Sequence, residues 1–137
     1  MLDLHDPETI RQLLLNTHTI AVVGLSDKPH RDSYRVAAYM QSNGYRIIPV
    51  NPRIDEVLGE KSYATLKEIP ESIELVNIFR KPEAVPEIIE EAIEVGAKSV
   101  WMQLGVIHSE AAEQARDAGL QVIMNRCIMV DHRQLID

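Results

Sequence analysis

Short runs of consecutive apolar residues recur along the chain and predict five β-strands. Several of these runs are rich in Val and Ile, and apolar residues follow one another instead of alternating with polar ones. This pattern is typical of strands that are buried on both faces. The predicted strands are Thr19–Val23, Ile47–Val50, Leu75–Phe79, Ser99–Met102 and Leu120–Met124.

Segments with helical periodicity lie between these runs. The clearest is Pro82–Val95, in which Ala, Val and Ile form one apolar stripe and glutamates cover most of the rest. Asp6 followed by Pro7 predicts the start of an N-terminal helix. The residues Thr65-x-x-Glu68 match a capping box that opens a short helix. The other predicted helices are Arg35–Ser42 and Ser109–Ala118.

The alternation of strands and helices predicts a three-layer α/β fold, with a parallel sheet covered by helices on both faces. Right-handed crossovers favour two strand orders, the Rossmann-like 3-2-1-4-5 and the flavodoxin-like 2-1-3-4-5, and the pattern alone leaves both open. Either order places a ligand at the carboxyl ends of the strands. At 137 residues we expect one domain, residues 1–137, with a helix in 1–17 packed on it.

Composition excludes several classes of protein. A net charge of −7, without an RNP-type or helix-turn-helix motif, argues against nucleic-acid binding. No apolar run is long enough to span a bilayer, and the acidic N-terminus does not match a secretory signal, so we expect a cytoplasmic protein. The single Cys127 excludes an internal disulfide, and we expect no metal site.

Half of the positive charge follows the predicted strands. Seven of the fourteen Lys and Arg residues lie just after a strand, whereas mainly Arg46 and Lys98 lie at the opposite rim. Carboxyl ends of parallel strands meet at one edge of the sheet, so this basic rim is expected to attract an anion. Its members are Lys28, Arg31, Arg35, Arg53, Arg80, Lys81 and Arg126.

The loops of this rim narrow the choice of anion. Gly24 is the only glycine of its loop, so the dinucleotide fingerprint G-x-G-x-x-G is absent, as is a P-loop. The second strand ends in Asn51-Pro52-Arg53, where an NAD-binding protein carries an acid. Arg53 suits a phosphorylated ribose instead, as in NADP or coenzyme A. Lys81 stands at a helix start without a capping acceptor, which either a phosphate or water together with Glu83 would satisfy.

Several motifs in the same order resemble the small single-domain CoA-binding proteins, which are similar to the N-terminal domain of the succinyl-CoA synthetase α subunit. The resemblance covers about residues 16 to 132. The motifs are Val22-Val23-Gly24-Leu25-Ser26-Asp27-Lys28-Pro29, Ser33-Tyr34-Arg35-Val36, Pro49-Val50-Asn51-Pro52, Val57-Leu58-Gly59, Trp101-Met102-Gln103 and Asn125-Arg126-Cys127.

This resemblance implies a Rossmann-type sheet of order 3-2-1-4-5 and coenzyme A or an acyl-CoA as the ligand. The loop of the synthetase is richer in glycine where this chain has Asp27 and Pro29. The phosphohistidine of the synthetase belongs to a later domain of that protein, so the resemblance does not imply ligase activity. The residues expected to bind CoA are Gly24, Ser26, Asp27, Lys28, Ser33, Tyr34, Pro52, Arg53, Phe79, Arg80, Lys81, Pro82, Met102, Gln103 and Leu104. Ser33 is equally well explained as a plain helix cap.

Candidate catalytic residues are few. His30 and His108 lie near the basic rim, but no carboxylate or cysteine stands at a spacing that suggests a catalytic dyad with either, and His5 and His18 are expected to face solvent. Cys127 is either a reactive thiol or a packed apolar side chain. We therefore expect a binding protein for CoA without catalysis of its own. The alternatives are a small enzyme acting on an acyl-CoA or nucleotide, an NADP-type nucleotide-binding module, and an interaction module that uses the acidic helix.

Overall fold

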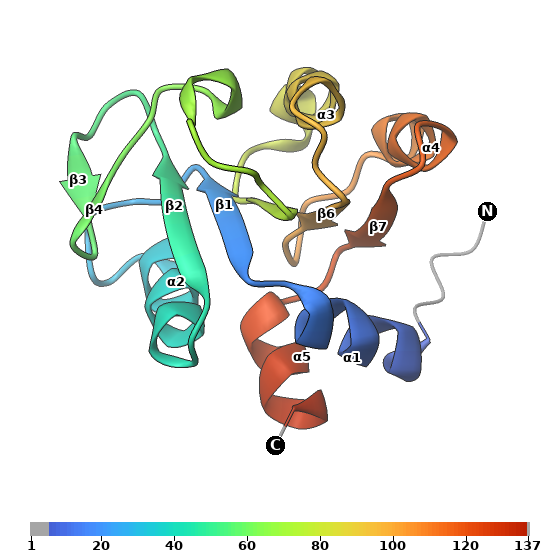
Figure 1. Cartoon of the computed structure of the whole chain (residues 1–137), viewed down its shortest axis with the longest axis horizontal. Coiled ribbons are helices and arrows are strands. Elements are labelled where there is room, and N and C mark those ends of the chain that lie inside the picture. Colours follow the sequence, from blue (N-terminus) through green and yellow to red (C-terminus); the bar gives the residue numbers. More distant parts are fainter. Residues whose placement is uncertain (1–5, 137) are drawn as a thin grey trace.

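A five-stranded parallel sheet runs through the centre of the molecule (Figure 1). The computed structural model describes residues 6–136. All five predicted strands are confirmed to within a residue or two. They are β1 (Thr19–Val23), β2 (Arg46–Val50), β5 (Leu75–Ile78), β6 (Ser99–Met102) and β7 (Gln121–Met124), in the order β2-β1-β5-β6-β7.

The five full strands, numbered 1 to 5 along the chain, lie in the order 2-1-3-4-5, and the sheet matches the Rossmann-like 3-2-1-4-5 pattern when a single bridge beside β2 is counted as the third strand. Leu75–Ile78 pairs with β1, not with β2. The place beside β2 is taken by Tyr63, which forms a single parallel bridge with Val50. The Tyr63 N–H donates to the Pro49 carbonyl at 3.0 Å, and the Asn51 N–H donates to the Tyr63 carbonyl at 2.9 Å. Counted in chain order, the third strand is therefore reduced to one bridge.

Helices cover the sheet on both faces, as predicted (Figure 1). One face carries α1 (Pro7–Asn16), α2 (Asp32–Ser42) and α5 (Ile128–Leu135), and the other carries η1 (Leu66–Glu68), α3 (Val85–Glu94) and α4 (Ser109–Asp117). Neighbouring strand residues point to opposite faces. In β6, Trp101 packs in the core under α1, α2 and α5, whereas Val100 and Met102 pack in the core under α3 and α4.

Three helix predictions need correction. The helix predicted over Pro82–Val95 is split into a 3₁₀ turn, η2 (Pro82–Ala84), followed by α3. Pro86 explains the break, because a proline lacks an N–H and its ring clashes with the carbonyl four residues earlier. The second helix begins at Asp32 rather than Arg35. The capping box at Thr65 does not form, since the Glu68 carboxylate accepts from the Ala64 N–H and Thr65 makes no side-chain cap bond.

Two elements were not predicted. The hairpin of β3 (Glu56–Val57) and β4 (Glu60–Lys61) has strands of only two residues, too short for a periodic signal. Helix α5 has eight residues and begins after Cys127, which makes no side-chain cap bond. The N–H of its first residue is instead satisfied by a distant side chain. The Ile128 N–H donates to Gln103 Oε1.

Candidate functional site

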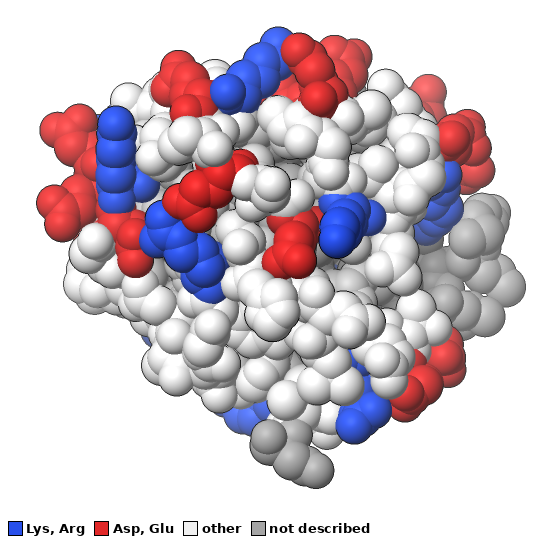
Figure 2. Space-filling view, viewed as in Figure 1, with Lys and Arg blue, Asp and Glu red and all other residues white. Residues whose placement is uncertain are grey.

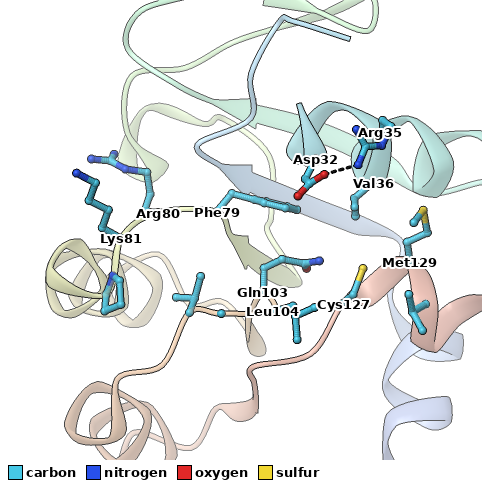
Figure 3. Close-up of a pocket in the computed structure, with 14 residues that line it drawn as sticks. Asp32, Arg35, Val36, Phe79, Arg80, Lys81, Gln103, Leu104, Cys127 and Met129 are labelled. Carbon is cyan, nitrogen blue, oxygen red and sulfur yellow. Dashed lines mark hydrogen bonds and ion pairs between the residues drawn. The ribbon is translucent and has the colours of Figure 1, made fainter. Parts of the chain in front are cut away.

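A cavity of about 640 Å³ lies at the carboxyl ends of β5, β6 and β7 (Figure 3). Four segments that are distant in the sequence form its walls: the start of α2, the loop after β5, the loop after β6 and the start of α5. The lining residues are Asp32, Arg35, Val36, Phe79, Arg80, Lys81, Pro82, Gln103, Leu104, Gly105, Val106, Cys127, Met129 and Val130.

Six of the predicted site residues line this cavity, namely Phe79, Arg80, Lys81, Pro82, Gln103 and Leu104. Arg80 and Lys81 extend on one side of it, whereas Phe79, Gln103 and Cys127 point towards its interior (Figure 3). Lys81 is the N-cap of η2 and makes no side-chain cap bond. One end of the cavity is therefore basic, and the rest is mainly apolar.

Met102, which was predicted to belong to the site, does not line this cavity. Its side chain is 0 % exposed and packs in the core beneath α3 and α4. Side chains alternate along a strand, so the residue that follows Met102 turns to the other side. Gln103 is that residue, and it reaches the cavity where Met102 does not.

The serines predicted to contact the ligand hold the loop after β1 together. Ser33 is buried, and its Oγ accepts a hydrogen bond from the Ser26 N–H at 3.0 Å. Ser26 Oγ in turn accepts from the Lys28 N–H at 3.0 Å. Ser33 is not the helix cap, because that position belongs to Arg31. Asp27 and Lys28 at the tip of the loop are exposed, and Tyr34 is half-buried on the α2 side of the core.

The fold itself requires a glycine at position 24, independently of any ligand. The φ of Gly24 is +88°, and a Cβ at this position would lie 2.3 Å from the Phe79 carbonyl oxygen. The Phe79 N–H donates to the Val23 carbonyl at 2.8 Å, which brings the loop after β5 against the end of β1. This close approach places Phe79 and Arg80 at the cavity.

Asn51 links two loops of the rim, a role that the sequence interpretation missed. Its Nδ2 donates to the Leu25 carbonyl at 3.0 Å, and its Oδ1 accepts from the Arg53 N–H at 2.9 Å. Pro52 and Arg53 are exposed beside the loop after β1 and do not line the cavity. An Asn followed by a turn predicts such a local contact, but the bond to Leu25 has no sequence signal.

Two members of the basic rim are neutralised by acids. The Arg126 guanidinium makes two hydrogen bonds with Asp131, at 2.7 and 2.8 Å, and these raise the pKa of Arg126. Arg35 pairs with Asp32, as the dashed line in Figure 3 shows. Within residues 6–136, no ion pair involves the other five members, Lys28, Arg31, Arg53, Arg80 and Lys81.

At the opposite rim, acidic side chains accompany the basic ones. Arg46 at the start of β2 pairs with both Glu60 and Glu71. Glu74 accepts hydrogen bonds from the N–H groups of His18 and Thr19; burial raises the pKa of Glu74, but these bonds outweigh it and the pKa is lowered. Figure 2 shows basic side chains interspersed with acidic ones over the face it presents, without a continuous positive patch.

Of the histidines considered as candidates, one caps a helix and two are exposed. The His108 side chain caps α4, with Nδ1 accepting from the Ala111 N–H at 3.1 Å. His30 and His18 are exposed, and His5 lies outside the described residues. Cys127 is half-buried and lines the cavity. Among residues 6–136, no group of three or more His, Cys, Asp or Glu side chains could hold a metal ion.

The cavity residues that were not predicted come from the first turns of two helices and from the loop after β6. Val36 lies in the first turns of α2, Met129 and Val130 lie in α5, and Gly105 and Val106 follow β6. Helix α5 carries no capping signal, so its first turn could not be assigned to the rim from the sequence. None of the described helices combines the length and the apolar character that crossing a membrane requires.

Residues 18–133 match the CoA binding domain family, and the chain belongs to this family. The protein is 47 % identical to uncharacterized protein YneT of Bacillus subtilis strain 168, over 90 % of this chain and 91 % of that one. It is 36 % identical to the alpha subunit of acetate–CoA ligase [ADP-forming] II of Pyrococcus furiosus, over 82 % of this chain, but spans only 27 % of that subunit. The solved structure of a hypothetical protein from Pyrococcus horikoshii OT3 has a TM-score of 0.96 and 43 % identity, over 99 % of this chain and 96 % of that one.

Proposed function

We propose that this protein binds coenzyme A or an acyl-CoA in the cavity at the carboxyl ends of β5, β6 and β7, without catalysing a reaction of its own. The observation that carries the proposal is the combination in one cavity of two cations, Arg80 and Lys81, that have no ion pair in the described part of the chain, with a mainly apolar remainder. CoA has the matching form, because its phosphates are anionic and its pantetheine arm is long and weakly polar.

The proposed orientation of the ligand follows from the difference between the basic end of the cavity and its apolar remainder. The diphosphate lies against Arg80 and Lys81, where charge-assisted hydrogen bonds are available. The arm then runs past Phe79 towards Cys127 and Met129, so the thiol or thioester lies at the start of α5. The 3′-phosphate of the ribose lies towards Arg53, which is outside the cavity and has no ion pair among the described residues.

A binding role is favoured over catalysis because, within residues 6–136, the candidate bases are engaged by other groups of the protein. His108 is engaged as a helix cap, and the carboxylates of Asp32 and Asp131 are paired with Arg35 and Arg126. General acid–base catalysis requires a group within hydrogen-bond reach of the reacting atoms. The cavity offers donors and apolar contacts instead.

Isothermal titration with CoA, dephospho-CoA, NADP and NAD tests the ligand. We expect CoA to bind most tightly and NAD most weakly; tighter binding of NADP than of CoA would overturn the proposal. Hydrogen–deuterium exchange with and without CoA tests the position. We expect protection of residues 79–81, 103–106 and 127–130, and none at the opposite rim around residues 72–74 and 95–98.

A further inference from the structure

We infer that Gln103 distinguishes an acyl-CoA from free CoA, because its side-chain amide donates a hydrogen bond to the carbonyl oxygen of the thioester. This inference rests on the proposed function and assigns a role to one residue of the same cavity. It is carried by the orientation of the Gln103 amide, the lack of a protein partner for its nitrogen, and its place beside Cys127.

The orientation of the amide is determined by a backbone donor. Gln103 Oε1 accepts from the Ile128 N–H at 3.4 Å and from Asn77 Nδ2 at 3.2 Å. A backbone N–H can only donate, so the Gln103 atom that faces it is the oxygen. Asn77 is 2 % exposed in the middle of the sheet, and its Nδ2 also faces the Trp101 carbonyl at 3.4 Å. Both neighbours therefore require Nε2 to point away from them.

The nitrogen of this amide has no partner within residues 6–136. Gln103 is only 6 % exposed, yet no fully buried polar side-chain atom of the described chain lacks a hydrogen bond. Nε2 must therefore open to the cavity, and Figure 3 shows the amide pointing into it. A nearly buried donor without an acceptor is unfavourable, which makes this position a site for an oxygen of a ligand.

The thioester is the acceptor that this position fits. Gln103 contacts the first residue of α5, next to Cys127, at the end of the cavity away from Lys81. The N–H groups of Met129 and Val130 lie on the same side and have no acceptor among the described residues, which adds positive potential there. An acyl-CoA presents a carbonyl oxygen at this end, whereas free CoA presents a thiol, a weak acceptor.

A pair of ligands that differ only in this oxygen gives the direct test. Acetyl-CoA and S-ethyl-CoA have nearly the same shape, but only acetyl-CoA carries the carbonyl. One hydrogen bond corresponds to about a 3- to 10-fold difference in Kd. We expect the wild-type protein to bind acetyl-CoA more tightly than S-ethyl-CoA by this factor, measured by isothermal titration at pH 8.

The substitution Gln103→Glu tests the role of the side-chain nitrogen alone. It retains an oxygen for Ile128 and Asn77 and keeps the shape of the side chain, but replaces the outward donor with an acceptor. We expect the preference for acetyl-CoA to be lost or reversed. Gln134→Glu, an exposed position on α5, is the matched control for the added charge and should retain the preference.

The outcomes separate the inference from the proposed function. Equal binding of the two ligands by the wild type overturns the inference even if Gln103→Glu does not fold, and so does a preference that survives in a folded Gln103→Glu protein. Equal losses for CoA and acetyl-CoA in the variant would assign Gln103 to an amide of the pantetheine arm instead. If the wild type binds none of the CoA ligands, the proposed function fails as well.

Discussion

Gly24 shows how one residue shapes the rim, because its missing Cβ lets the loop after β5 approach β1. An alanine here needs φ near +88° and places its Cβ against the Phe79 carbonyl. We expect Gly24→Ala to cost about 1–2 kcal/mol for the backbone conformation and about 1–3 kcal/mol more for the overlap. Urea unfolding measures the sum.

Gly44→Ala is the matched control for Gly24→Ala. Gly44 has φ +97°, but a Cβ there meets nothing within 4 Å, so only the conformational cost applies. Equal destabilisation by the two substitutions would show that the contact with Phe79 does not matter. Loss of CoA binding by a folded Gly24→Ala protein would in turn link this approach to the cavity.

Substitution of Arg53 tests which group of the ligand the exposed part of the rim binds. If its guanidinium holds the 3′-phosphate of CoA, Arg53→Ala should weaken CoA binding by about 1.5–3 kcal/mol, the range for a hydrogen bond to a charged group. Dephospho-CoA should lose much less, because it lacks that phosphate. The fold should be retained, since Arg53 is exposed.

Titration calorimetry of both ligands gives the comparison. Arg133→Ala, another exposed arginine located on α5, controls for the loss of one positive charge from the molecule. Equal losses for CoA and dephospho-CoA would show that Arg53 does not contact the 3′-phosphate. Lys28 and Arg80 would then be the better candidates.

At the scale of secondary-structure elements, the side chain of His132 connects helix α5 to helix α2. His132 is 5 % exposed, its Nδ1 lies 2.8 Å from the Tyr39 hydroxyl, and its ring meets Tyr39 and Tyr45 edge to face. Burial lowers the pKa of His132 below its ordinary value of 6.5. The neutral ring is therefore part of the contact that places α5, and with it the Cys127 end of the cavity.

This contact predicts a dependence of stability on pH. In the unfolded chain His132 gains a proton near pH 6.5, whereas in the folded protein it does so only at lower pH. The unfolded state thus binds more protons in that window, and the free energy of unfolding falls as pH is lowered from about 6.5. The slope contributed by one histidine is at most about 1.4 kcal/mol per pH unit.

Urea unfolding between pH 8 and pH 5.5 measures this slope. His132→Gln cannot titrate, so its free energy of unfolding should change less over this range, even if the variant is less stable at every pH. The other histidines and all carboxylates are the same in both proteins. Identical slopes in the two proteins would assign the dependence to another group.

For the whole molecule, the distribution of charge matters more than its sum. The net charge is −7, and CoA is an anion, so the overall field opposes binding. The five rim cations that make no ion pair within residues 6–136 attract it locally. Salt screens both effects, and the sign of the salt dependence shows which is larger.

We expect the local attraction to dominate. Raising NaCl from 50 to 200 mM should then weaken CoA binding by roughly 3- to 10-fold, because short-range pairs between phosphates and cations are screened. Pantetheine carries no charge and serves as the control ligand, with an affinity that salt should leave nearly unchanged. Stronger CoA binding at high salt would mean that the net charge controls association.

Much of the fold follows from local pattern. Consecutive apolar residues identified all five parallel strands, and the stripe in residues 82–95 identified the helix that became η2 and α3. Asp6 caps α1 as predicted, accepting from the Thr9 N–H. These features depend on residues within a few positions of each other, so the sequence alone contains the information.

The tertiary structure decided what depends on distant residues. Tyr63 rather than Leu75 lies beside β2, Asp131 neutralises Arg126 of the expected rim, and Met102 turns into the core. The direction of the Gln103 amide depends on Ile128, 25 positions away, and the need for Gly24 depends on Phe79. Local periodicity determined which segments become strands and helices and that basic residues follow them. Which side chains meet at the cavity was decided only when the parallel sheet brought the ends of four separate segments together.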